Sequence, residues 1–244
     1  MSLEILDAAG NVVRAFTQDE IPTERFRSFD NRGYEQQLVT GEPKAHISKG
    51  LNRFVWDMRY PSVSSIPGVP PVLIKPIAKP GTYQVRLTVD GDVQIQSFEL
   101  EMNPNETYSR EQTDAKGAFW MQLYAKAEEG VQAVLAAQAA IEAAQAAANA
   151  PGASDEVKEA AAELELASTE FIASMVATGR TLVQIISEPT KPLSKLVTLH
   201  NVMETSEGPP NAPLVTVYER TAGEIDAAIS QYNAVRDEAL ARLN

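Results

Sequence analysis

Residues 109–149, SREQTDAKGAFWMQLYAKAEEGVQAVLAAQAAIEAAQAAAN, decide the fold class of the second part of this chain. Ser109 and Gln112 have the spacing of a capping box, which starts a helix by bonding two of its free amides. Apolar residues then recur at alternating spacings of three and four, as in a helix that packs along one seam. That seam comprises Trp120, Leu123, Ala127, Gly130, Val134, Ala137, Ile141, Ala144 and Ala148.

Three further helices are predicted after the turn at Pro151-Gly152. With the first helix at about 109–149, they cover about 154–187, 193–206 and 214–243, each with an apolar seam and each bounded by proline or glycine. Trp120 in the first helix and Phe171 in the second are candidate core residues. Residues 105–244 are therefore expected to form an antiparallel α-helical bundle.

Composition changes sharply near Pro104. Residues 1–104 contain 9 of the 15 prolines but only 5 of the 34 alanines. Proline and β-branched residues suit strands and turns, whereas alanine suits helices. We therefore expect an α+β protein of two domains, with a β domain over 1–104 and the helical bundle over 105–244.

Short strands separated by turn residues make up the first domain. Residues 3–16 are expected to form a hairpin, residues 50–57 a strand with Trp56 in the core, and residues 82–102 a second hairpin that turns at Asp90-Gly91. Tyr83 is a second candidate core residue. Residues 17–49 are polar and read as a long insertion. Several such strands predict an antiparallel β-sandwich.

Residues 61–80 contain six prolines and cannot form a central strand. Apolar residues lie between these prolines: Val63, Ile66, Val69, Val72, Leu73, Ile74 and Ile77. One interpretation is an exposed surface that docks on a partner. The other is that this stretch folds back over the sandwich or the bundle.

Charge and residue usage exclude several classes of function. A net charge of −12 opposes binding to a phosphate backbone, so no nucleic-acid partner is expected. No apolar run is long enough for a membrane span. The chain has no cysteine and two histidines, His46 and His200, which lie far apart in the sequence. We therefore predict no metal site, no cofactor and no catalytic residues in this chain.

Two weaker patterns could instead indicate catalysis or ligand binding. Asp57, Asp90 and Asp92 could belong to a carboxylate pair, but aspartates in turns usually make local hydrogen bonds. Exposed aromatic rings could stack on a sugar, and the candidates for such a ligand site are Phe26, Phe29, Tyr34 and Tyr60. The other interpretation of these rings is that they hold a long loop against the sandwich.

Three motifs occur in order: LEILDxxGNVVR at 3–14, GxNxFxWD at 50–57 and PGTYxVRL at 80–87. As a set they resemble the immunoglobulin-like module of flagellar hook-capping proteins. The longer string GLNRFVWDMRYP at 50–61 resembles the carboxy-terminal region of bacterial sortilin-like proteins. Those proteins carry neuraminidase-type β-propeller repeats and are often named glycosyl hydrolases.

The resemblance implies an immunoglobulin-like sandwich that follows a β-propeller in an exported, periplasmic or extracellular protein. No secretory leader precedes Leu3, so the chain is expected to be a piece of that longer protein. Its expected function is a non-catalytic structural and interaction module whose partner is the upstream propeller of the same parent chain, or another protein or glycan. The alternative is a carbohydrate-binding accessory domain of a glycoside hydrolase.

Overall fold

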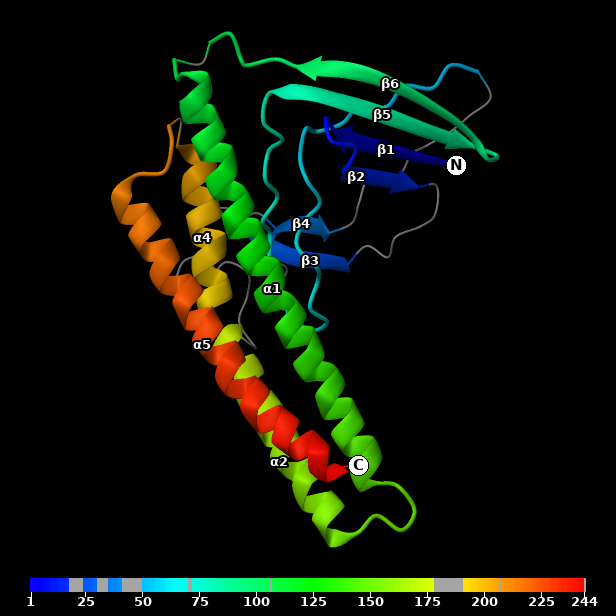
Figure 1. Cartoon of the computed structure of the whole chain (residues 1–244), viewed down its shortest axis with the longest axis vertical. Coiled ribbons are helices and arrows are strands. Elements are labelled where there is room, and N and C mark those ends of the chain that lie inside the picture. Colours follow the sequence, from blue (N-terminus) through cyan, green and yellow to red (C-terminus); the bar gives the residue numbers. More distant parts are fainter. Residues whose placement is uncertain are drawn as a thin grey trace. The chain divides into compact units, whose positions relative to one another are not determined.

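The computed structural model describes residues 1–17, 24–29, 35–40, 50–69, 72–105, 107–177, 191–206 and 208–243. Within them the chain has a four-stranded antiparallel sheet, a separate two-stranded sheet and four helices (Figure 1). The predicted α+β class is confirmed. The finer arrangement, an immunoglobulin-like sandwich followed by a bundle, goes beyond what this small sheet shows.

The larger sheet has the strand order β2-β1-β5-β6. Its strands are β1 (Ser2–Asp7), β2 (Val12–Thr17), β5 (Gly81–Val89) and β6 (Asp92–Leu100). Strands β3 (Glu24–Phe29) and β4 (Glu35–Thr40) pair with each other inside the predicted insertion, where no strand was expected. The helices are α1 (Arg110–Ala148), α2 (Asp155–Met175), α4 (Pro192–Thr205) and α5 (Ala212–Leu243).

The chain divides into two compact units. Unit 1 comprises residues 1–62, 75–121 and 205–209, and unit 2 comprises 63–74, 122–204 and 210–244. This division differs from the predicted domains in three places. Residues 63–74 group with helices rather than with the sheet, whereas the first turns of α1 and residues 205–209 group with the sheet.

The core of unit 1 forms on one face of the larger sheet. Phe16 and Tyr83 are buried there, and Phe98 stacks on the Tyr83 ring at 6.0 Å between centroids. Local turn chemistry sets the strand register, since the Asp7 carboxylate accepts bonds from the amides of Ala9 and Asn11. The buried cluster consists of Ile5, Val13, Phe16, Ala78 and Tyr83.

Residues 50–57 do not form the predicted strand. Phe54 and Trp56 pack against the core and Val55 between them is exposed, so the predicted alternation of faces holds over 53–56; Asn52, expected on the same face as Phe54, is exposed. Just beyond this segment Arg14 Nη1 donates to the carbonyls of Arg59 and Tyr60, both at 3.1 Å, and Arg59 forms an isolated antiparallel bridge with Ile77. Those carbonyls bond a side chain instead of a neighbouring strand.

A proline-rich strap, residues 63–74, packs on α1 within unit 2. Glu128 accepts bonds from the Ser64 amide at 2.8 Å and the Ser64 hydroxyl at 2.6 Å, and Gln138 Nε2 donates to the Pro67 carbonyl at 3.2 Å. Five of the seven apolar side chains between the prolines are buried, Val63, Ile66, Val69, Val72 and Ile74, and Leu73 and Ile77 are partly buried. The stretch is therefore not the exposed surface that the docking prediction required, and the other interpretation, that it folds back on the chain, describes these side chains.

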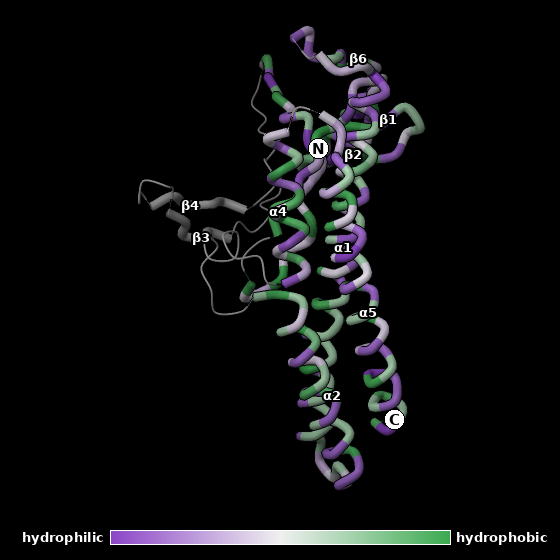
Figure 2. Tube along the Cα trace, turned by 90° about the vertical axis from the view of Figure 1, so that its left-hand side faces the viewer, coloured by the Kyte–Doolittle hydropathy of each residue, from purple (hydrophilic) through white to green (hydrophobic). Residues whose placement is uncertain are grey.

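The helices of unit 2 pack through alternating large and small side chains, and Figure 2 shows hydrophobic and hydrophilic residues mixed along each of them. At Gly130 a Cβ atom would lie 2.9 Å from a Leu193 methyl and 3.1 Å from the Met175 methyl, so a larger residue there would require these side-chain ends to shift. Ser154 caps α2 by accepting from the Val157 amide. The prediction that this helix continues to 187 is wrong, because the backbone is extended at Val176; residues 178–190 lie outside the described residues.

The Glu128 contact predicts a pH-dependent stability. Burial raises the pKa of Glu128, but bonds from the Ser64 hydroxyl, the Ser64 amide and Gln132 outweigh it and hold the pKa below its usual value. A carboxyl with a depressed pKa stabilises the fold above its unfolded pKa of about 4.3, and this contribution is lost as the pH falls through the folded pKa.

Glu128→Gln should therefore lower the free energy of unfolding by about 1 kcal/mol at pH 7, and by less as the pH drops below about 4. Urea unfolding across pH 3 to 7 measures this difference. Glu142→Gln, which changes an exposed carboxyl on the same helix, is the control and should be neutral. A difference between Glu128→Gln and the parent that does not vary with pH would contradict the assignment.

Candidate functional site

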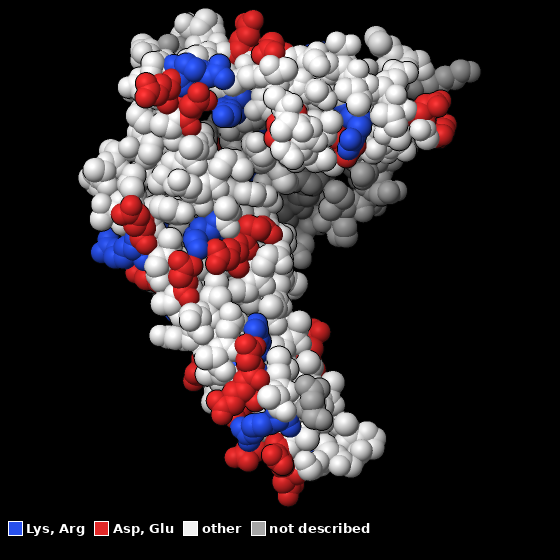
Figure 3. Space-filling view, in the orientation of Figure 1, with Lys and Arg blue, Asp and Glu red and all other residues white. Residues whose placement is uncertain are grey.

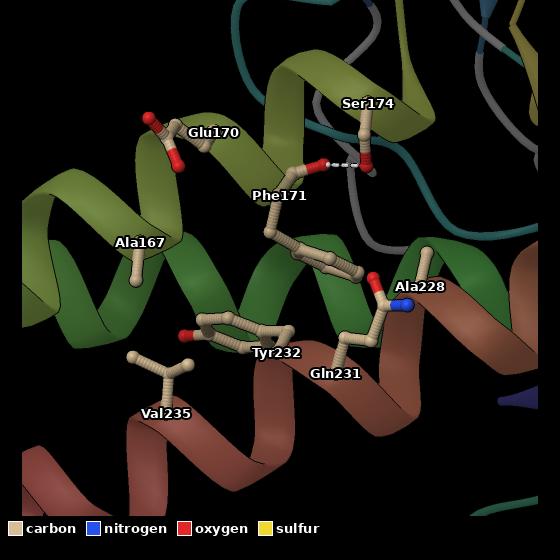
Figure 4. A pocket seen from close by; sticks show the side chains of 8 residues that line it. All are labelled: Ala167, Glu170, Phe171, Ser174, Ala228, Gln231, Tyr232 and Val235. Atoms are coloured by element: carbon tan, nitrogen blue, oxygen red, sulfur yellow. Dashed lines mark hydrogen bonds between the residues drawn. The ribbon is translucent and has the colours of Figure 1, made fainter.

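A groove between α2 and α5 in unit 2 has a volume of about 310 Å³ (Figure 4). Its floor consists of Phe171 and Tyr232, whose rings stack at 4.5 Å between centroids and 14° between planes. Ala167 and Ala228 flank these rings and leave the groove open. Helical spacing places them there, because each alanine is four residues before an aromatic ring on its own helix.

The polar groups of this groove are mostly engaged. The Tyr232 hydroxyl bonds Ser168 at 3.0 Å, and the Ser174 hydroxyl donates to the Phe171 carbonyl at 2.7 Å. Exposed Glu170 and Gln231 lie at the rim. A carboxylate and an amide beside stacked rings can accept a hydrogen bond from a bound group, so this arrangement suits binding of a side chain or small molecule.

A second cavity of about 290 Å³ lies within unit 1. Trp120, Leu100 and Ile77 give it an apolar wall. Lys116 and Lys79 also line it; the Lys116 ammonium lies 5.1 Å from the centroid of the Trp120 ring and donates to the Ser206 carbonyl. This combination of an aromatic wall and cations suits a small ligand with an apolar body and an anionic group.

The predicted aromatic ligand residues are not brought together by any described contact. Phe26 and Phe29 belong to β3, where only the backbone is described, and Tyr34 lies outside the described residues. Tyr60 is partly buried and packs against the core of unit 1, and burial raises the pKa of its hydroxyl. The glycan-binding alternative therefore stays a prediction.

The candidate acids serve local structure. Asp57 lies 3.3 Å from the buried Arg14 guanidinium and also accepts from the Arg59 amide. Asp90 has a positive φ of 51° in the β5–β6 turn, and Asp92 begins β6. Across the described residues no group of three or more histidines and carboxylates is arranged to hold a metal ion.

The two histidines and the predicted core residues are placed as follows. His46 lies outside the described residues, whereas His200 is buried in α4. Tyr83, Trp120 and Phe171 are buried, and Trp56 is partly buried with its indole N–H donating to the Arg59 carbonyl at 3.1 Å. No described helix is long and apolar enough to cross a membrane.

Acidic side chains recur along the helical part of the face drawn in Figure 3, with lysines and arginines among them. Within unit 2, acidic and basic side chains form ion pairs, such as Lys126 with Asp226 at 2.7 Å and Lys195 with Glu224 at 2.6 Å. Pairing of this kind is typical of a solvated helix surface.

The sequence did not predict either cavity, although Phe171 and Trp120, which line them, were expected in the core. A tyrosine at an apolar position of a helix needs a partner for its hydroxyl, so Tyr232 could have indicated its contact with Ser168. Lys116 and Trp120 have the i, i+4 spacing of neighbours on one helix face, which could have indicated the cation over the ring.

The Ser168–Tyr232 hydrogen bond is expected to couple α2 to α5. Ser168→Ala leaves a buried hydroxyl without this partner and should cost about 1 to 2 kcal/mol of unfolding free energy. The double variant Ser168→Ala/Tyr232→Phe should cost less than the sum of the two single changes, because both partners are then absent. Additive losses in urea unfolding would contradict this contact, and Leu166→Ala, at a residue 61% exposed on α2, is the control.

No family model, no curated protein and no solved structure matches this chain. The resemblance to the sortilin-like proteins and the hook-capping module therefore rests on the three sequence motifs alone, and its implications are carried forward as proposals.

Proposed function

We propose that this chain is a non-catalytic structural and interaction module of a larger exported protein, and that it docks on the β-propeller that precedes it. In this proposal unit 1 is the immunoglobulin-like module, and the helices that follow it in the sequence pack as a bundle. The parent protein would be periplasmic or extracellular. The motifs at 3–14, 50–57 and 80–87 supply the family resemblance on which the propeller partner depends.

One observation in unit 1 supports a docking role. Leu51 is 99% exposed and Val55 is 71% exposed, although both are large apolar residues in a segment that lies against the sheet. Met58, in the same segment, is 45% exposed; we call these three exposed apolar residues of 51–58 the apolar row, although the exposed Arg53 lies between the first two of them. Grouped apolar side chains in water are typical of an interaction surface.

Contacts on the opposite side of this segment hold the row in place. The Phe54 ring lies 4.5 Å from that of Phe16, and the Trp56 ring lies 5.7 Å from that of Tyr83. The buried Arg14 fixes the carbonyls that follow. Since Phe54 and Trp56 already anchor the backbone of this segment, binding of a partner to the row would cost little further backbone conformational entropy.

Isothermal titration calorimetry of this chain with the separately produced upstream region tests the proposal. We expect binding at micromolar concentration, weakened about 100-fold by the double variant Leu51→Ser/Val55→Ser, because each buried side chain contributes about 1.5 to 3 kcal/mol. Leu166→Ser, at a residue 61% exposed on α2, is the matched control and should leave the affinity unchanged.

Two results would contradict the proposal. One is a reading frame that begins at Met1, since no upstream partner would then exist. The other is an absence of heat and of co-migration at high micromolar concentration with both proteins folded by circular dichroism.

A further inference from the structure

Strand β6 forms an edge of the four-stranded sheet, and its other edge bonds no described strand. Its residues pair with β5 in unbroken register from Asp92 opposite Val89 to Leu100 opposite Gly81. Every residue from Asp92 to Ser97 is exposed, and Val93 and Ile95 are 55% and 56% exposed. The strand therefore presents both a free backbone edge and β-branched side chains.

Edge strands in monomeric proteins normally carry features that block pairing with another chain, such as a lysine, a proline, a bulge or an inward-pointing charge. The opposite edge, β2, has such features: the register shifts between Ile5 and Leu6, and Arg14 points inward to Asp57. Strand β6 has none of them. Its central residues 93–98, VQIQSF, carry no charge, and no register shift interrupts its pairing with β5.

We propose that β6 pairs antiparallel with β6 of a second copy of this chain, which joins two four-stranded sheets into one eight-stranded sheet. An antiparallel pair of identical strands has a twofold axis, so each strand meets its own sequence reversed. With the axis at Ile95, Ile95 meets its counterpart, Val93 meets Ser97, and Gln94 meets Gln96. Asp92 meets Phe98, so no carboxylate faces another across the pair.

Charge and side-chain chemistry favour a second copy over an unrelated strand. Side chains alternate along a strand, which places Val93, Ile95 and Ser97 on one face and Gln94, Gln96 and Phe98 on the other. Reversal keeps each set on its own face, so Ile95 meets Ile95 on one side and Gln94 meets Gln96 on the other. Residues 1–104 contain 11 basic and 13 acidic residues, so the sheet region repels a second copy far less than the net charge of −12 suggests.

This interface lies on a different strand from the apolar row of residues 51–58 and does not depend on the proposed propeller partner. Sedimentation velocity of the intact chain from 1 to 200 µM tests it. We expect a concentration-dependent shift from monomer to dimer. Ile95→Lys should weaken the dimer about 100-fold, since a lysine on an edge strand is a natural block to pairing. Val12→Lys, at a residue 51% exposed on the opposite edge, should leave dimerisation unchanged.

A cysteine scan keeps the proposal falsifiable if a lysine variant folds poorly. The chain has no cysteine, so a single introduced thiol can form only an intermolecular disulfide. Under mild copper-phenanthroline oxidation, single cysteines at residues 93 to 97 should give fastest dimer formation near Ile95→Cys, and Val12→Cys should react slowly. A monomer at all concentrations, equal disulfide rates at β6 and β2, or loss of the dimer in Val12→Lys alone would overturn the proposal.

Discussion

Two backbone groups of the strap of residues 63–74 bond side chains of α1, and these two bonds hold the strap against the helix. Prolines prevent the strap from joining a strand ladder, yet a buried backbone amide without a partner costs about 1 to 3 kcal/mol. Glu128 supplies the acceptor for the Ser64 amide, and Gln138 supplies a donor for the Pro67 carbonyl. These polar contacts allow the apolar side chains between the prolines to be buried.

In unit 1 a charged side chain also bonds backbone groups of an irregular segment, but here the side chain is a cation. The Arg14 guanidinium is buried and donates to two successive carbonyls, of Arg59 and Tyr60, which would otherwise need a neighbouring strand. Its charge is balanced by Asp57 at 3.3 Å. These bonds tie residues 57–60 to β2, directly after the segment in which Leu51 and Val55 are exposed.

The sequence predicted the elements whose causes are local. Helical periodicity and caps gave α1 within one residue at each end, and the Asp7 and Asp90 turns marked both hairpins. The long-range contacts could not be predicted from the sequence. Residues 50–57 have a strand pattern but join no described strand, and the bonds of Arg14 to Asp57, Arg59 and Tyr60 just after them span 43 to 46 residues of sequence. The position of the strap could not be predicted, because it depends on the contact of Ser64 with Glu128, 64 residues away, and neither residue type is distinctive alone.

The candidate sites were less predictable than the fold. Tyr232 and Phe171 meet only because α2 and α5 pack side by side, and the cavity beside Trp120 draws on four separate segments of unit 1. The edge of β6 is different, because strand order decides which strand is outermost. The alternation of VQIQSF is visible in the sequence, but its exposure follows from the order β2-β1-β5-β6.

Thiol accessibility tests the central claim, burial of the strap, most directly. Val63 is 4% exposed and Val55 is 71% exposed, so Val63→Cys and Val55→Cys make the same chemical change in the two environments. With Ellman's reagent in native buffer, Val55→Cys should react at the rate of a free thiol. Val63→Cys should react at least about 100-fold more slowly, and at the same rate as Val55→Cys in urea, because burial limits access until the strap opens. Equal rates in native buffer would contradict the account.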